Sequence, residues 1–387
     1  MRAIVTAARL WSAEGMVENP VVAIEDGRIV EITSTKESWA TPAHSFPDAT
    51  LAPAFFDVHF HGAAGHDVME ATPEALAAIG SFLPQHGTAT YLATTVTAPL
   101  DATLRAVSGL AKLISRPDLL PGAGNTARPV GIHLEGPFLS HERRGVQPAE
   151  HLLAPDIAIF DRLYEAAEGH VKLMTLAPEL PGAVELAAHA TARGVRVSLG
   201  HSDATAAQAR AAVAAGAVSA THIYNAMRPL DHREPGILGV ALTEDRLYAE
   251  LICDGIHVAP DTVRLWWKAK GAQRGILVTD AMSATGMPDG EYQLGGFPVQ
   301  VANGCATARG VLAGSVLTQD RALSNFLQFT GAPLEQAIRL LTANPAQMTG
   351  TNAQLAVGAP ADMVAVDPNG RLIATILEGR LTAAHGL

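Results

Sequence analysis

The sequence predicts an α/β protein built on a (β/α)8 TIM-like barrel, with a small β-sandwich domain assembled from both chain termini. Between residues 55 and 280, short apolar runs alternate with alanine-rich segments of helical pattern, and there are eight such runs. Strands that alternate with helices pair in parallel, and eight units of this kind fit a barrel. A doubly wound open sheet would need a glycine-rich phosphate-binding turn after its first strand, and Phe-Asp-Val-His-Phe-His-Gly at 56–62 is not one.

The two ends of the chain share a pattern of short strands and turns that differs from the pattern of the middle. Residues 21–24 and 28–32 form a pattern typical of a β-hairpin that turns at Asp26-Gly27. The runs at 362–366 and 372–379 repeat this pattern near the C-terminus. We therefore expect residues 1–52 plus 351–387 to form the β-sandwich domain and 53–350 to form the barrel.

The middle of the chain supplies the barrel elements in order. One insertion interrupts them, a hairpin over 295–310 that turns at Asn303-Gly304. The expected strands are 55–59, 90–95, 130–135, 171–176, 195–201, 217–222, 249–254 and 275–280, and the clearest helices are 72–85, 100–114, 183–193 and 205–215.

Composition limits the possible functions. A chain of 387 residues with 48% hydrophobic and 17% charged residues is typical of a folded globular protein. Its net charge of −11 argues against a nucleic-acid partner or an anionic membrane surface, which need an extended basic face. The N-terminus has no apolar segment of the ~20 residues that a membrane span requires. Two cysteines, Cys253 and Cys305, build no disulfide framework, so we expect a cytoplasmic location.

Titratable residues stand at or near the ends of the apolar runs. The run that begins at Pro129 ends in Glu135, and a carboxylate there is costly unless it is paired or bound to a metal. The carboxyl ends of barrel strands face one mouth, where active sites lie, and alternation along a strand puts His59 and His61 on one side. Imidazole and carboxylate together suit Zn²⁺ or another first-row divalent metal. The residues so placed are Asp57, His59, His61, Glu135, His201, His222, Asp254, His257 and Asp280.

Each of these histidines, taken singly, is more often a satisfied core or surface residue than a ligand. The joint pattern is much harder to explain in that way, because many matches fall in order along one chain.

Several longer motifs in the chain resemble those of a known enzyme superfamily. Pro-Ala-Phe-Phe-Asp-Val-His-Phe-His-Gly at 53–62 resembles the first-strand signature of the metal-dependent amidohydrolase superfamily. The remaining motifs resemble its N-acetylglucosamine-6-phosphate deacetylase family, and 358–364 resembles the closing β-domain of the superfamily. They are His-Leu-Glu-Gly-Pro-Phe-Leu at 133–139, Gly-His-Ser-Asp-Ala-Thr at 200–205, Thr-His-Ile-Tyr-Asn-Ala-Met at 221–227, Arg-Glu-Pro-Gly at 233–236, Cys-Asp-Gly-Ile-His-Val at 253–258, Val-Thr-Asp-Ala-Met at 278–282, Leu-Ala-Gly-Ser at 312–315 and Thr-Ala-Asn-Pro-Ala at 342–346.

The resemblance implies roles for the strand-end residues. It makes Glu135, His201 and His222 the metal ligands and Asp280 the catalytic acid and base. A bound cation lowers the pKa of its water toward ~7 and polarises the acetamide carbonyl. Asp280 would take the proton from that water and give it to the departing amine. We expect one Zn²⁺ ion, and His59 with His61 leaves a second ion open; the alternative for Asp280 is a cap for a following helix.

One loop departs from the family pattern. Where the family usually has Lys-Gly-Ala-His, this chain has Arg-Gly-Val-Gln at 144–147, so Val146 and Gln147 take the substrate-contacting positions. The family histidine polarises the substrate carbonyl, whereas Gln147 donates an N–H without a charge. Alternatively the loop pairs differently, and His141 or His151 substitutes.

Substrate contacts also follow from the resemblance. Asn225, Ala226, Arg233 and His257 would hold the 6-phosphate of a phosphorylated amino sugar, some of them from the partner subunit of a homodimer. An arginine with a histidine supplies the local positive charge that a dianion needs on an acidic protein. The alternative for Arg233 is a surface salt bridge with Asp231 or Glu234. The remaining predicted contacts, along the sugar ring, are Leu312, Ala313 and Gly314.

The predicted activity is hydrolysis of N-acetylglucosamine 6-phosphate to glucosamine 6-phosphate and acetate. The galactosamine epimer is an alternative, since no motif distinguishes the two sugars. A further alternative is another amidohydrolase that acts on an N-acyl substrate, of the D-aminoacylase or dihydroorotase type. These enzymes usually carry a bridging carboxylated lysine on the fourth strand, but here Lys172 begins that strand at the wrong end, and Glu135 can serve instead. A third interpretation, an inactive barrel kept as an assembly protein, predicts the loss of a ligand or of Asp280, and all are present.

Overall fold

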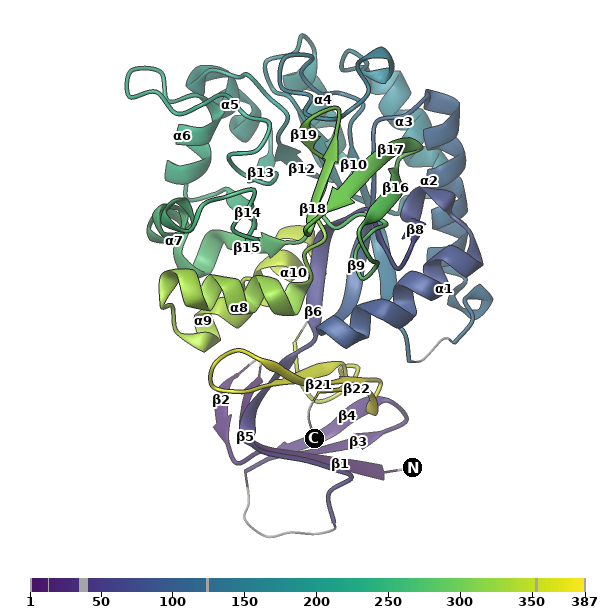
Figure 1. The fold of residues 1–387 in the computed structure, drawn as a ribbon, viewed down its shortest axis with the longest axis vertical. Coiled ribbons are helices and arrows are strands. Elements are labelled where there is room, and N and C mark those ends of the chain that lie inside the picture. Colours follow the sequence, from purple (N-terminus) through teal and green to yellow (C-terminus); the bar gives the residue numbers. More distant parts are fainter. Residues whose placement is uncertain (1, 13, 35–40, 123–124, 352–353, 386–387) are drawn as a thin grey trace.

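The main body of the molecule is a barrel of parallel strands (Figure 1). A computed structural model describes residues 2–12, 14–34, 41–122, 125–351 and 354–385. Within these residues an eight-stranded sheet has the order β15-β14-β13-β12-β11-β10-β9-β6. This order confirms the predicted (β/α)8 barrel. Its strands are β6 (Phe55–Phe60), β9 (Thr88–Thr95), β10 (Arg128–Glu135), β11 (Val171–Leu176), β12 (Arg196–Leu199), β13 (Ala217–Ala220), β14 (Tyr248–Ile252) and β15 (Gly275–Val278).

The barrel closes just beyond β15. There the backbone N–H of Asp280 donates to the His59 carbonyl at 2.9 Å, and that of His61 donates to the Ala281 carbonyl at 2.8 Å. Phe60 and Ala281 form an isolated parallel bridge. Closure therefore places Asp280 directly beside His59 of β6 and His61, the residue that follows the strand.

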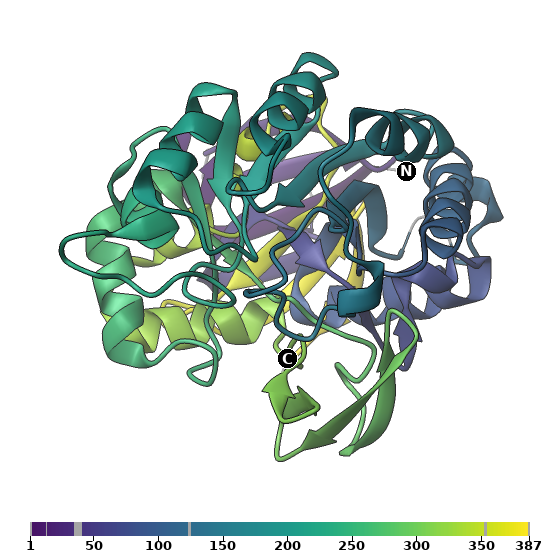
Figure 2. The same ribbon diagram turned by 90° about the horizontal axis from the view of Figure 1, so that it is seen from above.

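Helices surround the barrel, as the view from above shows (Figure 2). The predicted helix at 72–85 begins with Thr72, whose hydroxyl accepts from the Ala75 N–H, and ends at Phe82 where a 3-10 turn with Pro84 follows. The α-helices are α1 (Pro73–Phe82), α2 (Leu100–Ser115), α3 (Ile157–Ala166), α4 (Ala183–Ala192), α5 (Ala206–Ala214), α6 (Gly236–Thr243), α7 (Pro260–Arg274), α8 (Gln319–Thr330), α9 (Leu334–Arg339) and α10 (Ala343–Thr349). The 3-10 helices are η1 (Val68–Glu70), η2 (Leu83–His86), η3 (Pro117–Leu119) and η4 (Ala149–His151). No helix in the described residues is both long and apolar enough to span a membrane.

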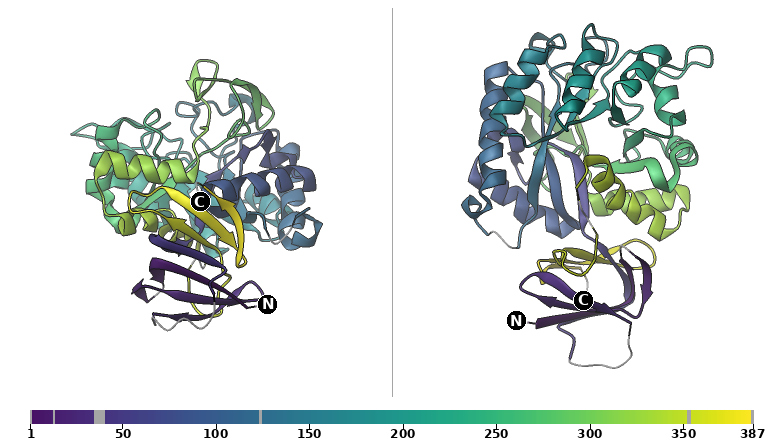
Figure 3. Two further views of the ribbon diagram at one scale, coloured as in Figure 1. Left: turned by 60° about the horizontal axis from the view of Figure 1, so that its bottom comes forward. Right: turned by 180° about the vertical axis from the view of Figure 1, so that it is seen from behind.

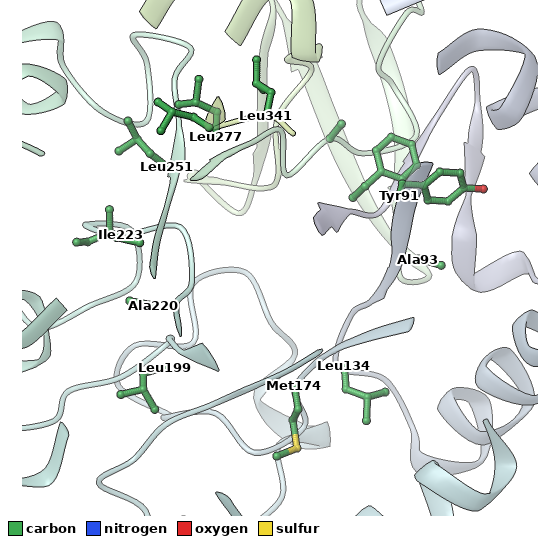
Figure 4. Packing of buried hydrophobic residues seen from close by; sticks show 14 of the residues in the cluster. Tyr91, Ala93, Leu134, Met174, Leu199, Ala220, Ile223, Leu251, Leu277 and Leu341 are labelled. Atoms are coloured by element: carbon green, nitrogen blue, oxygen red, sulfur yellow. The ribbon is translucent and has the colours of Figure 1, made fainter. Parts of the chain in front are cut away.

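The main hydrophobic core lies between the strands and the helices. Leu134, Met174 and Leu199, from three neighbouring strands, belong to this core and are fully buried (Figure 4). Successive side chains of a strand point to opposite faces, so Glu135 points away from the side that Leu134 occupies. Packing of the apolar residues thus turns the polar ones toward the barrel interior.

The terminal strands form a second eight-stranded sheet, with the order β22-β21-β20-β5-β1-β3-β4 and β2 paired to β1. The sheet lies beside the end of the barrel where β6 begins, and its strands are arranged in layers around an apolar core that includes Leu51, Met363 and Ile376 (Figures 1 and 3). This arrangement supports the proposed division at residues 52 and 351, which stays a proposal. The strands are β1 (Arg2–Ser12), β2 (Gly15–Glu18), β3 (Val21–Glu25), β4 (Arg28–Thr33), β5 (His44–Pro53), β20 (Met363–Val366), β21 (Leu372–Leu377) and β22 (Arg380–Ala384).

An inserted four-stranded antiparallel sheet stands at one side of the barrel, as the view from above shows (Figure 2). Its middle hairpin turns at Asn303 and Gly304, which both have positive φ, as predicted. Val299 and Val301 of this sheet pack with Val96 and Met282 of the barrel rim. The insertion is larger than the predicted hairpin and comprises β16 (Gly290–Leu294), β17 (Phe297–Ala302), β18 (Cys305–Ala308) and β19 (Val311–Leu312); a short hairpin of β7 (Gly62–Ala63) and β8 (His66–Asp67) follows β6.

Candidate active site

Three side chains, from the ends of β10, β12 and β13, meet at the carboxyl end of the barrel. Glu135 ends β10, and its Oε1 lies 3.1 Å from Nε2 of His201 and 3.1 Å from Nε2 of His222. The two imidazole Nε2 atoms are themselves 3.1 Å apart. All three side chains are buried, and their ligand atoms are close enough to hold one ion. The structure thus brings together the three residues predicted to bind metal.

The backbone at three of the predicted residues is strained. His201, His222 and Asp280 have φ values of 45°, 25° and 51°, in a region that residues other than glycine adopt at a cost of roughly 1–3 kcal/mol each. Each follows the end of a strand, where the turn redirects the side chain toward the mouth. The surroundings hold Asp280 in this conformation, since its carbonyl accepts from the Ser315 N–H at 2.7 Å.

His59 and His61 complete the cluster from β6. Their Nε2 atoms are 3.2 Å apart, as the alternation of the strand predicts. Nε2 of His61 lies 3.0 Å from Oδ1 of Asp280, and Nε2 of His59 lies 3.4 Å from the same oxygen. His59 is fully buried and His61 is 2% exposed. The two predicted histidines therefore lie beside Asp280 as well as beside Glu135.

Backbone carbonyls set the orientation of two imidazole rings. Nδ1 of His201 lies 3.0 Å from the Arg143 carbonyl, and Nδ1 of His61 lies 3.0 Å from the Thr94 carbonyl. A carbonyl only accepts, so these contacts place the proton of each neutral ring on Nδ1. The Nε2 lone pairs then point into the cluster, as metal ligands require.

His59 also contacts a carboxylate, Glu250, that we did not single out from the sequence. Glu250 of β14 is fully buried; its Oε2 lies 3.4 Å from Nδ1 of His59, and its Oε1 accepts from the Ser219 hydroxyl at 3.3 Å. The only signal in the sequence is a glutamate inside the apolar run Tyr-Ala-Glu-Leu-Ile at 248–252. Such a residue can equally face solvent, so the pattern alone did not identify it.

Asp57 does not belong to the cluster and has a structural role. Its Oδ2 accepts from the Thr279 hydroxyl at 2.6 Å, which ties β6 to the residue after β15. Burial raises the pKa of this carboxyl to about 6, against hydrogen bonds that lower it. Asp57 therefore helps to hold the closure of the barrel beneath the histidines.

Charge interactions dominate the cluster. Burial acts to raise the pKa of Glu135, but His59, His201 and His222 together hold it well below its usual range. Asp280 follows the same rule, because His59 and His61 outweigh burial and lower its pKa. Burial acts to lower the pKa of His59, yet Glu135 and Asp280 raise it well above its ordinary value. Carboxylates at this site therefore stay ionised and need positive charge beside them.

The donor set fits a divalent cation. Within the described residues, sets of three ligand atoms lie within 4.8 Å of one another in Glu135–His201–His222, in His59–His61–Glu135 and in His59–His222–Asp280. Neutral imidazole nitrogens that face one another at 3.1–3.2 Å repel unless a proton or a cation lies between them. Nitrogen and carboxylate oxygen are the ligands of zinc and its neighbours in the first row. The centre is therefore able to bind metal.

The cluster opens into a cavity of about 350 Å³, within the range for small-molecule sites. Seven of the predicted substrate-contacting residues line it, and Ala313 is fully buried between two of them. Those seven are Val146, Gln147, Asn225, Ala226, His257, Leu312 and Gly314; the wall also includes Val96, Glu142, Arg143, Leu294 and Val311.

His257 brings positive charge to this cavity. Its Nδ1 lies 2.6 Å from Oδ2 of Asp254. Burial acts to lower the pKa of His257, but the Asp254 carboxylate raises it above its ordinary value. Asp254, which we predicted at the end of the seventh strand, thus serves His257 and does not contact the histidines of the centre.

Arg233 is the predicted phosphate contact that lies outside the cavity wall. It is exposed, and its backbone N–H donates to Oδ1 of Asp231 at 2.8 Å. Its guanidinium lies within 4.0 Å of no carboxylate in the described part of the chain, so the salt bridge with Asp231 or Glu234 is not formed. A role for Arg233 toward phosphate stays a prediction.

The geometry also bears on three alternatives that the sequence left open. Gln147 is buried and lines the cavity, whereas His141 and His151 do not line it, so neither takes its place. The cap interpretation of Asp280 is wrong, because the next element after it is the strand β16 and not a helix. Lys172 lies near the start of β11, three residues before Thr175, the residue that pairs with Glu135, so it is not placed to bridge metals.

Comparison with known proteins gives consistent matches. A model of the amidohydrolase family matches residues 50–382. The N-acetylglucosamine-6-phosphate deacetylase of Lysinibacillus sphaericus is 39% identical over 373 residues, 96% of this chain and 95% of that protein. The N-acetylgalactosamine-6-phosphate deacetylase of Escherichia coli O157:H7 is 37% identical over 387 residues, 99% of this chain and 100% of that protein.

The same likeness holds among solved structures. A mutant N-acetyl-D-glucosamine-6-phosphate deacetylase from Mycobacterium smegmatis, in complex with N-acetyl-D-glucosamine-6-phosphate, superimposes with a TM-score of 0.91 at 36% identity. The match covers 99% of this chain and 100% of that one.

Proposed function

Because this chain belongs to the amidohydrolase family, we propose that it is the metal-dependent hydrolase that converts N-acetylglucosamine 6-phosphate to glucosamine 6-phosphate and acetate. The family membership confirms the resemblance inferred from the motifs. One observation carries the proposal: Glu135, His201 and His222 converge within ligand distance of one ion, and Asp280 faces the same cavity. This arrangement also disfavours an inactive barrel.

The residues that would hold the cation are Glu135, His201 and His222. We propose Zn²⁺, because two imidazoles with one carboxylate and an open position are typical of catalytic zinc sites. When bound, the ion supplies an acidified water and polarises the amide carbonyl. His59 and His61 stand beside the same carboxylate, so the chain also has donors for a second ion.

Asp280 supplies the proton transfers. Its lowered pKa keeps it as a carboxylate at neutral pH, which is the form that accepts a proton. An amine is a poor leaving group until it is protonated, so the same carboxyl then returns the proton to the sugar nitrogen. The fixed, strained backbone of Asp280 limits its side chain to the direction of the cavity, which favours both transfers.

The cavity wall suits a small phosphorylated sugar. His257 offers a cation at one side of the wall, held by Asp254, and Asn225 with Ala226 follows β13 nearby. Leu312, which ends the inserted sheet, and Gly314, two residues later, offer an apolar surface for the ring of the sugar. We propose that the phosphate is recognised at the His257 side, with Arg233 contributed when two copies associate as a homodimer.

The second candidate substrate is N-acetylgalactosamine 6-phosphate. One relative with this activity matches 99% of the chain, at nearly the same identity as relatives that act on the gluco epimer. The epimers differ in the direction of one hydroxyl. We place the gluco epimer first because the named activity recurs in relatives from several organisms.

A cytoplasmic location is proposed from the two free cysteines, Cys253 and Cys305.

The direct test is acetate release from both 6-phosphates by zinc-loaded protein. We expect one acetate per sugar, with a higher kcat/KM for N-acetylglucosamine 6-phosphate. A higher value for the galacto epimer would select the second candidate. Absence of acetate from either sugar, with stoichiometric zinc on the same sample, would overturn the deacetylase proposal.

A further inference from the structure

Gln147 is buried at the wall of the cavity and makes two short hydrogen bonds. Its Oε1 accepts from the backbone N–H of Thr97 at 2.8 Å, and its Nε2 donates to Oε2 of Glu135 at 2.9 Å. It is only 3% exposed. A flipped amide would set two N–H groups against each other and two oxygens against each other, so the network fixes the orientation. The N–H group of Gln147 therefore points at the carboxylate.

The anchor of this amide is part of the barrel frame. Thr97 follows β9, whose neighbour in the sheet is β10, the strand that ends in Glu135. The backbone N–H of Gln147 also donates to the Arg144 carbonyl at 3.1 Å, which closes the turn that presents the side chain. Gln147 thus links the backbone after one strand to the functional side chain at the end of the next.

The contact divides the two oxygens of Glu135 between different partners. Oε1 faces Nε2 of His201 and of His222, each at 3.1 Å. Oε2 receives the amide N–H and lies 3.4 Å from Nε2 of His61. Without a donor at Oε2, the carboxylate can rotate about its last bond and exchange the two oxygens. With the donor, one oxygen stays directed at the pair of histidines.

We infer that Gln147 is a positioning residue, which acts by holding the Glu135 carboxylate in the orientation that binds metal. The inference rests on the metal centre of the proposed function, and it assigns a role to the residue that stands where the family usually has a histidine. A neutral amide suits this task, since it can accept from Thr97 and donate to Glu135 at once. The competing role is a contact made only with the substrate carbonyl.

The two roles differ in what they do to metal binding. Loss of an outer partner of a ligand typically weakens metal affinity about 10–100-fold. Loss of a contact made only with substrate changes KM or kcat and leaves the affinity of the sugar-free protein for metal unchanged. Zinc affinity in the absence of sugar therefore separates them.

The experiment compares Gln147→Met and Gln147→Glu with the unchanged protein, with zinc affinity measured by competition against a chromogenic chelator and no sugar present. Methionine keeps the length and removes both hydrogen bonds, whereas glutamate keeps the acceptor for Thr97 and replaces the donor with an anionic oxygen that repels Oε2 of Glu135. We expect zinc affinity to fall about 10–100-fold in both variants. At saturating zinc, we expect kcat to fall by a larger factor than KM rises.

Val146→Ala is the matched control, because Val146 lines the same cavity and makes no hydrogen bond to Glu135. Its zinc affinity should equal that of the unchanged protein. Unchanged zinc affinity in both Gln147 variants would overturn the positioning role, and a raised KM alone would assign Gln147 to substrate. Should Gln147→Met fail to fold, the glutamate variant decides. Zinc affinity is read without catalysis, so a failure of the deacetylase proposal would leave this test intact.

Discussion

The metal centre is built from two groups of side chains that reach the same point by different routes. The open ligand group, Glu135, His201 and His222, stands at the ends of β10, β12 and β13 and lines the cavity. The buried pair, His59 and His61, lies at the end of β6; His61 reaches the cavity wall and His59 does not. Two members of the open ligand group hold positive φ values, whereas neither member of the buried pair does.

This difference indicates a division of tasks. Strained backbone is retained where a side chain must face substrate, since the cost is compensated only by function. The buried pair needs no strain because the alternation of a strand already directs both rings to the centre. We therefore assign the first metal ion to the open ligand group and regard the buried pair as charge support for Glu135 and Asp280, with capacity for a second ion.

The largest effect should follow from the residue that lies between the two groups. Asp280→Asn keeps the size of the side chain and removes its proton-accepting form, so we expect kcat to fall roughly 10²–10⁴-fold. Bound metal should stay at the level of the unchanged protein, as measured by elemental analysis. Near-normal acetate release by this variant would remove Asp280 from the mechanism.

The next effect separates the two groups by metal content. His201→Ala should weaken zinc affinity by more than the roughly 10–100-fold that loss of an outer partner costs, because it deletes a ligand. His59→Ala should leave one tightly held zinc ion per chain. The comparison uses zinc competition at equal protein concentration. Equal losses of zinc affinity in the two variants would show that both groups bind the same ion, which would contradict the division of tasks.

A smaller effect concerns the substrate side of the open ligand group. Arg233→Ala should lower kcat/KM for the phosphorylated sugar about 10–100-fold, the value of a lost charge-assisted contact. Unphosphorylated N-acetylglucosamine should be affected far less. Arg246→Ala is the matched control, since Arg246 is exposed and pairs with Glu244 away from the cavity. Equal losses on both sugars would show that Arg233 does not contact phosphate.

The smallest effect is a pH dependence at His257. Burial lowers and Asp254 raises the pKa of His257, with a net increase, so the cation persists through neutral pH and is lost as pH rises through the raised pKa. The stability that the pair contributes follows the same sign: it is complete below the unfolded pKa near 6.5 and lost above the folded one. We expect KM for the phosphorylated sugar to rise severalfold between pH 7 and pH 9. In His257→Gln, KM should be higher at neutral pH and nearly flat; a parallel rise in that variant would exclude His257 as the source.

Much of this centre could be predicted from the sequence, because strand ends and two-residue alternation are periodic signals. Glu135 ends an apolar run, and His59 with His61 follows the period of a strand, so their convergence required only the barrel. Glu250 was missed because a single glutamate in an apolar run carries no information on which way it faces. The two hydrogen bonds of Gln147 depend on a loop without any period, and only the folded backbone of Thr97 places its partner.

The position of Arg233 is another feature that the sequence could not predict. Its motif predicts a phosphate contact, yet in the single chain the residue is exposed beyond the cavity wall. A contact supplied by a second copy depends on a surface of that copy, and no pattern within one chain encodes the distance. The hairpin at 295–310 was predicted from its Asn-Gly turn. The strand β19 has only two residues, and Gly295-Gly296, the turn that joins β16 to the hairpin, was not interpreted as a second turn.

The position of zinc in a crystal of the metal-loaded protein, located by anomalous scattering at the zinc edge, would test the assignment of the metal centre without any assay of turnover. We expect a peak within about 2.0–2.3 Å of Glu135, His201 and His222, the usual zinc–ligand distances, with Asp280 facing the open position. A strongest peak elsewhere, or one bound by His59 and His61 without His201 and His222, would contradict that assignment.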